Sequence, residues 1–189
     1  WNVIKINGAW KVFDATWGAG DGDVDKRGKF FFIKKYKEQW FNFSPYEAIF
    51  THFHEDPSFM FINPKITLEE YEKFPYVSSI AFTSGLLNAK ESYLQSVHKP
   101  AIKYPIIYEM NLIDFEVLQA PKTWRMKRRK KHVFKFNVRN VLDIYLYEND
   151  DLKDTFKNEN EGHNFTLEYM NKEKAKVDIV IKTLEGELY

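Results

Sequence analysis

Asp14 is the residue of this chain whose position best suits catalytic chemistry, because it directly follows an expected β-hairpin. Strands over residues 3–6 and 10–13 flank Asn7-Gly8, a pair that tolerates the positive φ angles of a two-residue type I′ turn. Side-chain alternation then puts Asp14 on the same face as large apolar residues. A carboxylate on such a face needs a partner, and an Asp at the end of a hairpin can orient a catalytic His.

A structural role explains Asp14 equally well at this level. Its carboxylate can cap the turn that follows by accepting hydrogen bonds from nearby backbone N–H groups, with Thr16 assisting. The pattern of residues therefore predicts a buried, partnered carboxylate and leaves its role open.

A short acidic run, Asp21-Gly22-Asp23-Val24-Asp25, resembles the opening of an EF-hand calcium loop. Such a loop needs Gly at its sixth position and Glu at its twelfth, where this chain has Lys26 and Phe32. The two cations that follow the run, Lys26 and Arg27, would also repel a metal ion. We therefore expect a solvated polar loop over residues 21–28 and no metal site.

A second polar cluster, His52-Phe53-His54-Glu55-Asp56, contains the only closely spaced pair of histidines. On a helix, His52 and Asp56 would share a face, and His54 would not join them. A third metal ligand is not evident nearby. The pattern favours helix-end and loop roles, because His interacts well with the dipole at a helix C-terminus.

A basic segment over residues 122–132 lies between two expected strands. Its seven cations are Lys122, Arg125, Lys127, Arg128, Arg129, Lys130 and Lys131. Two interpretations stay open: a solvated loop that protects a sheet edge, or a site for phosphates, acidic protein tails or anionic lipid. Nucleic acid is disfavoured, because Trp124 is the sole aromatic stacking platform in the segment.

The remaining patterns predict two structural units. In the first, residues 30–34 and 37–43 are expected strands, Ser44 caps a helix that runs to about residue 53, and Thr67 caps another that ends near residue 73. Residues 83–102 form an expected connector. In the second unit the expected strands are 104–108, 112–118, 132–138, 143–147, 164–169 and 177–183, with a further strand beginning at 186–189. Strands at this spacing without helices between them favour a β-sandwich.

Composition favours an ordinary folded protein. The chain has 189 residues, 44% of them hydrophobic and 17% aromatic, which is enough for a sizeable core. Its formal net charge of +1 implies no particular partner. Without any Cys it has neither disulfides nor cysteine metal ligands, a composition that fits a cytoplasmic protein. No apolar run approaches the roughly 20 residues that span a bilayer.

Residues 1–82 resemble the C-terminal half of a transglutaminase-like (papain-like) core domain. The resemblance lies in Trp1-Asn2, in the hairpin with Asp14-Ala15-Thr16-Trp17-Gly18-Ala19-Gly20, in Trp40-Phe41-Asn42-Phe43-Ser44-Pro45, in residues 49–57 and in residues 66–71. The later segments are most similar to the branch that contains kyphoscoliosis peptidase, cytokinesis proteins and hillarin. An immunoglobulin-like domain at 103–189, truncated, would fit that arrangement after the 83–102 connector. The resemblance thus implies an α+β fold, with an antiparallel sheet and short helices followed by a β-sandwich.

The resemblance implies a Cys-His-Asp triad in which Asp14 is the orienting carboxylate. The family His would lie two positions before Trp1, with the Cys further upstream, so we expect a fragment of a longer protein or assembly. Two functions follow. One is a scaffold, cytoskeleton-associated in ciliary or contractile structures, that binds protein partners such as acidic cytoskeletal surfaces through the basic segment. The other is a cysteine peptidase or protein-crosslinking acyl transferase. No cofactor is implied.

Overall fold

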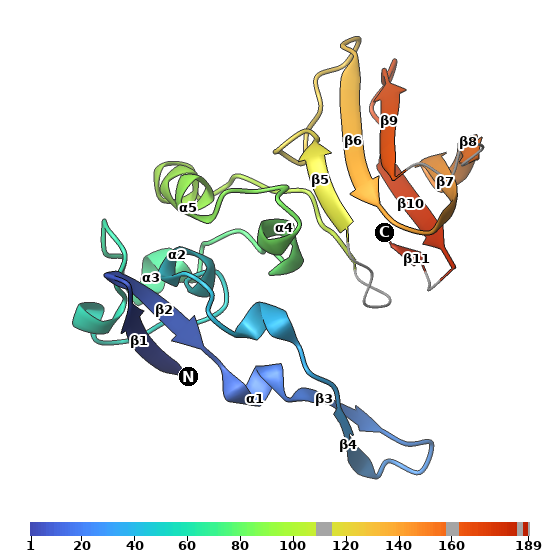
Figure 1. The fold of residues 1–189 in the computed structure, drawn as a ribbon. Coiled ribbons are helices and arrows are strands. Elements are labelled where there is room, and N and C mark those ends of the chain that lie inside the picture. Colours follow the sequence, from blue (N-terminus) through green and yellow to red (C-terminus); the bar gives the residue numbers. More distant parts are fainter. Residues whose placement is uncertain (109–114, 158–162, 185–186, 189) are drawn as a thin grey trace. The chain divides into compact units, whose positions relative to one another are not determined.

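A computed structural model describes residues 1–108, 115–157, 163–184 and 187–188 of the chain (Figure 1). It is a mixed structure of antiparallel sheets and mostly short helices, which agrees with the predicted α+β class at that level. Contacts divide the chain into two compact units. The first comprises Trp1–Pro75 with Ala89–Ala101, and the second comprises Tyr76–Asn88 with Ile102–Tyr189.

The predicted first hairpin is confirmed. Strands β1 (Asn2–Ile6) and β2 (Ala9–Phe13) pair antiparallel. Asn7 and Gly8 have φ angles of 48° and 82°, the positive values that a type I′ turn requires. Helix α1 (Ala15–Gly18) begins directly after Asp14. Asp14 therefore lies at the junction between strand β2 and helix α1.

The prediction of a polar loop over residues 21–28 is wrong for the first half of this segment. Strand β3 (Gly20–Val24) pairs antiparallel with β4 (Phe30–Lys34), and the connecting turn covers residues 25–29 only. Asp25 closes this turn, because its Oδ1 accepts the backbone N–H groups of Arg27 at 2.8 Å and Lys29 at 2.9 Å. The acidic and glycine residues of β3 gave no strand signal of their own, and the aromatic strand opposite supplies the ladder partners.

The strand predicted over residues 37–43 is also wrong. Its centre is the 3-10 helix η1 (Glu38–Trp40), and its last residue, Phe43, makes an isolated bridge with Val12 of β2. Phe43, Val12 and Ala48 form a buried apolar cluster in the first unit. The aromatic residues of this segment are thus used for packing rather than for a sheet.

Both predicted N-caps, Ser44 and Thr67, are confirmed, and each is part of a capping box. Ser44 and Glu47 cap helix α2 (Pro45–Ala48), and Thr67 and Glu70 cap helix α3 (Leu68–Tyr71). Helix α2 is shorter than predicted, since it ends at Ala48 and continues as turns to Thr51 rather than as helix to residue 53. A short 3-10 helix, η2 (Pro57–Phe59), follows.

The predicted connector contains a helix. Helix α5 (Ala89–His98) belongs to the first unit, and its buried residues are Ser92, Tyr93 and Ser96. The Tyr93 hydroxyl donates to the carbonyl oxygen of Pro64, and the Ser96 hydroxyl donates to the Ser92 carbonyl at 2.8 Å. Because small polar residues make up most of its buried face, the helix lacks the apolar periodicity by which helices are recognised.

The second unit contains helix α4 (Ile80–Thr83) and two antiparallel sheets. One sheet has the order β5 (Phe115–Gln119), β6 (His132–Val138) and β9 (Asn164–Tyr169). The other has the order β11 (Glu187–Leu188), β10 (Val177–Thr183), β7 (Val141–Glu148) and β8 (Asp151–Lys157). Apolar residues of both sheets are buried, among them Phe134, Val138, Ile144 and Val180. The immunoglobulin-like assignment stays a prediction.

Most predicted strands of the second unit are confirmed, namely those at 132–138, 143–147, 164–169 and 177–183, and residues 187–188 of the last. Of the strand predicted at 112–118, the part from Phe115 is observed, and residues 112–114 lie outside the described residues. The segment 104–108 is not a strand, since Pro105 lacks the N–H that a ladder needs. Strand β8 was not predicted. It follows β7 through a hairpin turn in which Asn149 and Asp150 have positive φ angles.

None of the helices in the described part of the chain has the length and apolar character needed to cross a membrane.

Candidate functional site

Asp14 is buried at the end of β2, with 6% of its surface exposed. Its Oδ1 accepts the backbone N–H of Trp17 at 2.9 Å, which makes Asp14 the N-cap of α1. Its own backbone N–H donates to the carbonyl oxygen of Trp40 at 2.9 Å. The predicted burial and the predicted capping of the next turn are both confirmed.

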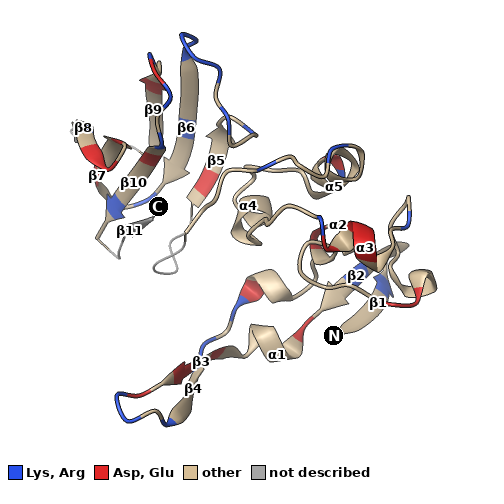
Figure 2. Cartoon of the chain, turned by 180° about the vertical axis from the view of Figure 1, so that it is seen from behind, with Lys and Arg blue, Asp and Glu red and all other residues tan. Residues whose placement is uncertain are grey.

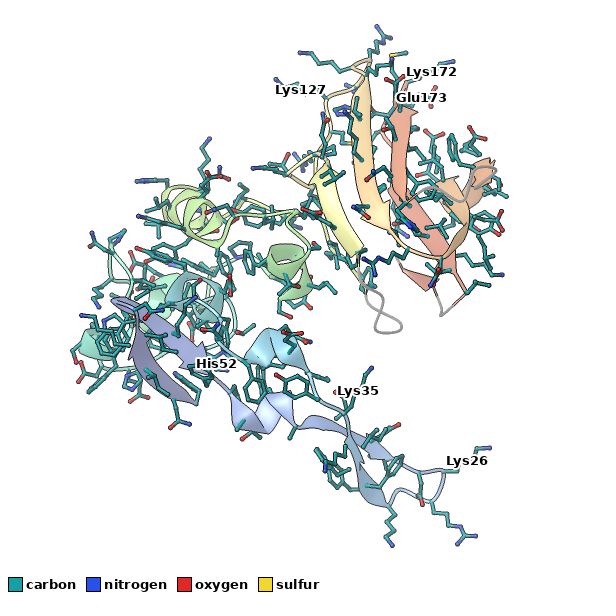
Figure 3. The ribbon with its side chains drawn as sticks, viewed as in Figure 1. Lys26, Lys35, His52, Lys127, Lys172 and Glu173 are labelled. Atoms are coloured by element: carbon teal, nitrogen blue, oxygen red, sulfur yellow. The ribbon has the colours of Figure 1, made fainter. Side chains whose placement is uncertain are left out.

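The second carboxylate oxygen of Asp14 is within hydrogen-bond distance of His52. The distance from His52 Nε2 to Asp14 Oδ2 is 3.0 Å, and His52 is 7% exposed. The turn after α2 positions His52, because its backbone N–H donates to the Ala48 carbonyl at 2.7 Å. Figure 3 shows His52 in the first unit, at the hairpin of β1 and β2. The structure thus brings together two polar side chains that are 38 residues apart.

Aromatic rings surround the His52 imidazole. Its centroid lies 4.8 Å from those of Trp1 and Trp17, and 5.8 Å from those of Trp40 and Phe43. These rings exclude water from the carboxylate–imidazole contact, which strengthens the electrostatic interaction between the two groups. They also fix the ring plane, so that Nε2 has a single direction in which to donate.

An ionised carboxylate can accept hydrogen bonds but cannot donate them, so Nε2–H of His52 is the donor to Asp14. The other ring nitrogen, Nδ1, lies 2.7 Å from Thr51 Oγ1, which itself lies 3.2 Å from the Ala48 carbonyl oxygen.

The environment keeps Asp14 ionised. Burial by itself raises the pKa of the carboxyl, but the hydrogen bonds from His52 and from the Trp17 N–H outweigh it and leave the pKa below its ordinary value. Asp14 and His52 therefore form a buried carboxylate–imidazole pair. Such a pair can orient an imidazole for acid–base chemistry, and it can also lock two segments of a fold together.

A small pocket borders this pair in the first unit. His52 and His54 lie on its wall, and the other lining residues are mostly apolar, among them Trp1, Ile49, Met60 and Phe61. The described residues contain no group of three or more His, Cys, Asp or Glu side chains that could hold a metal ion. The chain also has no Cys to act as a thiolate nucleophile beside the pocket.

The predicted shared face of His52 and Asp56 does not form, because α2 ends before either residue. Asp56 instead caps η2, with its Oδ1 accepting the backbone N–H of Ser58 at 2.8 Å. His54 Nδ1 accepts the backbone N–H of Asp56 at 3.1 Å. His52 does lie just after a helix end, and His54 lies in a loop, as predicted.

The two charged runs are exposed. Of the acidic run, Asp21 pairs with Lys37 and Asp25 closes the β3–β4 turn. The basic segment lies between β5 and β6 (Figure 2), and its seven cations, Lys122, Arg125, Lys127, Arg128, Arg129, Lys130 and Lys131, are all exposed. Lys131 pairs with Glu168 at 2.5 Å, and the Arg129 N–H donates to the Asn171 carbonyl at 2.9 Å. Partner binding by this loop stays a prediction.

Sequence reasoning missed His52 as the partner of Asp14. The available signal was indirect: a carboxylate on an apolar face needs a donor, and His52 follows a capped helix whose sequence contributes buried apolar residues. Whether the two side chains meet depends on the path of the chain between residues 14 and 52, which includes strand β3 and helix η1, neither of which was predicted.

Comparison with known proteins gives homologues for about half of the chain. Kyphoscoliosis peptidase of Mus musculus is 32% identical over 89 residues, which cover 47% of this chain and 13% of that protein. Hillarin of Drosophila melanogaster is 30% identical over 100 residues, 49% of this chain and 12% of hillarin. Cytokinesis protein 3 of Schizosaccharomyces pombe is 30% identical over 91 residues, 46% of this chain and 9% of that protein.

These similarities confirm the predicted resemblance to that group of proteins. The matched segments nevertheless span only about a tenth of the relatives' lengths. No protein-family model matches the chain. No solved structure shows a significant match either.

Proposed function

We propose that this chain is an interaction module of a larger transglutaminase-like protein, which acts as a cytoskeleton-associated scaffold. The observation that carries this proposal is that both carboxylate oxygens of Asp14 accept hydrogen bonds within the fold. One carboxylate oxygen caps α1 and the other holds His52. The residue that best matches a catalytic triad thus has a complete structural role, in a chain that contains no Cys.

The names of the relatives agree with this proposal. One homologue is named for cytokinesis, a process carried out by the cytoskeleton. The exposed basic loop offers a surface for the acidic tails and filaments of that system, since clustered cations attract acidic partners over a distance of about 8 Å at physiological salt. The proposed partners are therefore acidic cytoskeletal proteins, and the proposed location is the cytoplasm.

Cosedimentation with microtubules and with actin filaments tests the scaffold proposal. We expect the chain to pellet with at least one filament, and to lose most of this binding when Arg128, Arg129 and Lys130 are changed together to Gln. The matched control changes Lys135, Arg139 and Lys153 to Gln, which removes the same charge from exposed positions elsewhere in the second unit. Equal loss in both triple variants, or no pelleting of the unchanged chain, would contradict the proposal.

A specific observation also favours a second function, that of a cysteine peptidase or crosslinking acyl transferase. In the register of the hairpin, Asn2 is opposite Phe13, so Trp1 falls opposite Asp14, and a strand continued to two positions before Trp1 would place a side chain on the face that Asp14 shares. The family His would occupy that position. A carboxylate has about four acceptor sites, so its bonds to Trp17 and His52 leave room for another donor.

The full-length protein discriminates between the two functions. A Cys that opens an upstream helix, together with a His two positions before Trp1, would favour the enzyme. In that case Asp14→Asn should lower kcat by about 10⁴, the size of the effect when the orienting carboxylate of a serine-protease triad is replaced. Wild-type turnover in a folded Asp14→Asn variant would exclude the triad role.

A further inference from the structure

One face of the β3–β4 ribbon of the first unit is apolar except for Lys34 at its end. Val24, Phe30 and Phe32 lie on it and are 56%, 66% and 54% exposed. Gly22 is opposite Phe32 and Val24 is opposite Phe30, while Gly20 is opposite Lys34. A Cβ on Gly22 would lie 2.5 Å from the Phe30 ring, so this ring covers the bare glycine backbone. Apart from Lys34 at its end, the face therefore has no hydrogen-bonding side chains.

Charge is divided between the two sides and the ends of this ribbon. Asp21 and Asp23 pair with Ile33 and Phe31, which puts both carboxylates on the opposite face. Cations lie at both ends of the apolar face: Lys26, Arg27 and Lys29 in the turn, and Lys34 in the last pair of the ladder. Figure 3 shows Lys26 at the turn. The acid of the turn, Asp25, is engaged with backbone N–H groups.

This arrangement calls for a partner outside the described chain, since a two-stranded ribbon with an exposed aromatic face is marginally stable alone. A protein interface of comparable size would supply hydrogen bonds, about one per 100–200 Å². On the apolar face only Lys34, in the last pair of the ladder, has a side chain that can make them. A bilayer interface needs none, because aromatic rings enter the acyl boundary while Lys and Arg reach the phosphates around them.

We propose that the face of Val24, Phe30 and Phe32 docks on a membrane surface that contains anionic lipid. The ribbon lies flat, with its apolar face toward the acyl chains and its flanking cations at the headgroups. The carboxylates of Asp21 and Asp23 then point away from the negative surface. This inference is independent of the basic loop and of the scaffold proposal.

Vesicle cosedimentation of the 189-residue chain tests the docking surface. We expect binding to vesicles of phosphatidylcholine with phosphatidylserine, and at least tenfold weaker binding to phosphatidylcholine alone. The double variant Phe30→Ser/Phe32→Ser should lose at least tenfold in affinity. The matched control, Phe31→Ser/Ile33→Ser, removes similar apolar groups from the opposite face and should lose less than threefold. Thermal unfolding of each variant checks that the first unit stays folded.

Two adjacent labels then report which face enters the lipid. Because the chain has no Cys, Val24→Cys and Asp23→Cys each give a single site for an environment-sensitive fluorophore, on opposite faces of one strand. We expect a blue shift on anionic vesicles for the label at 24 and none for the label at 23. Equal shifts would overturn the proposal, and this readout does not depend on the folding of the serine variants.

Three further outcomes would also overturn it: no binding to anionic vesicles; binding that is lost in the Arg128, Arg129 and Lys130 variant and retained in the Phe30 and Phe32 variant; or concentration-dependent dimers of the chain that the Phe30 and Phe32 changes abolish. The second outcome would assign lipid binding to the basic loop. The third would assign the face to a second copy of this chain.

Discussion

The Asp14–His52 pair and the β3–β4 ribbon, both in the first unit, place chemically opposite groups in unfavourable surroundings. The pair puts a carboxylate and an imidazole among aromatic rings, and each finds its hydrogen-bond partner inside the fold. The ribbon puts phenylalanines in solvent, where no described residue covers them. A buried polar group without a partner lowers the stability of the fold, whereas an exposed apolar side chain changes it little, because that side chain is exposed in the unfolded chain as well. The Asp14–His52 pair therefore contributes to the stability of the fold, whereas the exposed face of the β3–β4 ribbon indicates a partner.

Phe43→Ala should have the largest effect on stability. Phe43 is 7% exposed in the cluster with Val12 and Ala48, so its removal leaves a cavity. We expect a loss of about 4 kcal/mol in the free energy of unfolding. Urea unfolding followed by tryptophan fluorescence measures it, because four of the five tryptophans, Trp1, Trp10, Trp17 and Trp40, belong to the first unit. A loss below about 1.5 kcal/mol would mean that the cluster is not the core of this unit.

Asp14→Ala should come next, with a loss of about 3 kcal/mol, because it leaves the N–H groups of His52 and Trp17 buried without an acceptor. Asp14→Asn keeps one acceptor oxygen and should lose less. The same urea titration measures both variants. If Asp14→Ala were as stable as the unchanged chain, the carboxylate would not be the link between β2 and the turn after α2.

Lowering the pH should have opposite effects on the contributions of two carboxyls to stability, those of Asp14 and of Glu47 in the capping box of α2. Hydrogen bonds lower the pKa of Asp14 despite its burial, so its stabilising effect is present above its unfolded-state pKa and is lost as pH falls through the folded-state value. Burial raises the pKa of Glu47 despite its hydrogen bond to Ser44. The contribution of the Glu47 carboxyl to the stability of the fold is therefore present at low pH and is lost as pH rises through the folded-state value.

Unfolding titrations at several pH values check this difference in sign. Between about pH 5 and about pH 3, the advantage of the unchanged chain over Asp14→Asn should shrink. Over the same interval, the stability of the unchanged chain relative to Glu47→Gln should increase. Two parallel curves would show that the folded environment does not distinguish the two carboxyls.

Phe32→Ala should have the smallest effect, within about 0.5 kcal/mol of the unchanged chain. Phe32 is the same residue type as Phe43, but its ring stays in solvent in the folded chain. The same fluorescence assay gives the number. A loss comparable to that of Phe43→Ala would mean that the ribbon face is part of the core, and it would remove the reason for a membrane partner.

Local chemistry explains which elements were predictable. Asn7-Gly8, Ser44 with Glu47, and Thr67 with Glu70 each complete their hydrogen bonds within four residues, and all three form as predicted. Helix α5 was missed because its buried face carries Ser92 and Ser96, which do not give the apolar periodicity of a helix. Strand β3 was missed because its Asp and Gly residues depend on an aromatic strand opposite them.

The amino-acid sequence by itself determined that Asp14 is a buried carboxylate at the end of a hairpin and that it needs a partner. The tertiary structure alone decided that the partner is His52, and that Phe30 and Phe32 face solvent while Phe43 is buried. The physical reason is the range of each interaction. Turns and caps are fixed by neighbouring backbone groups, whereas a contact between residues 14 and 52 depends on the path of all the chain between them.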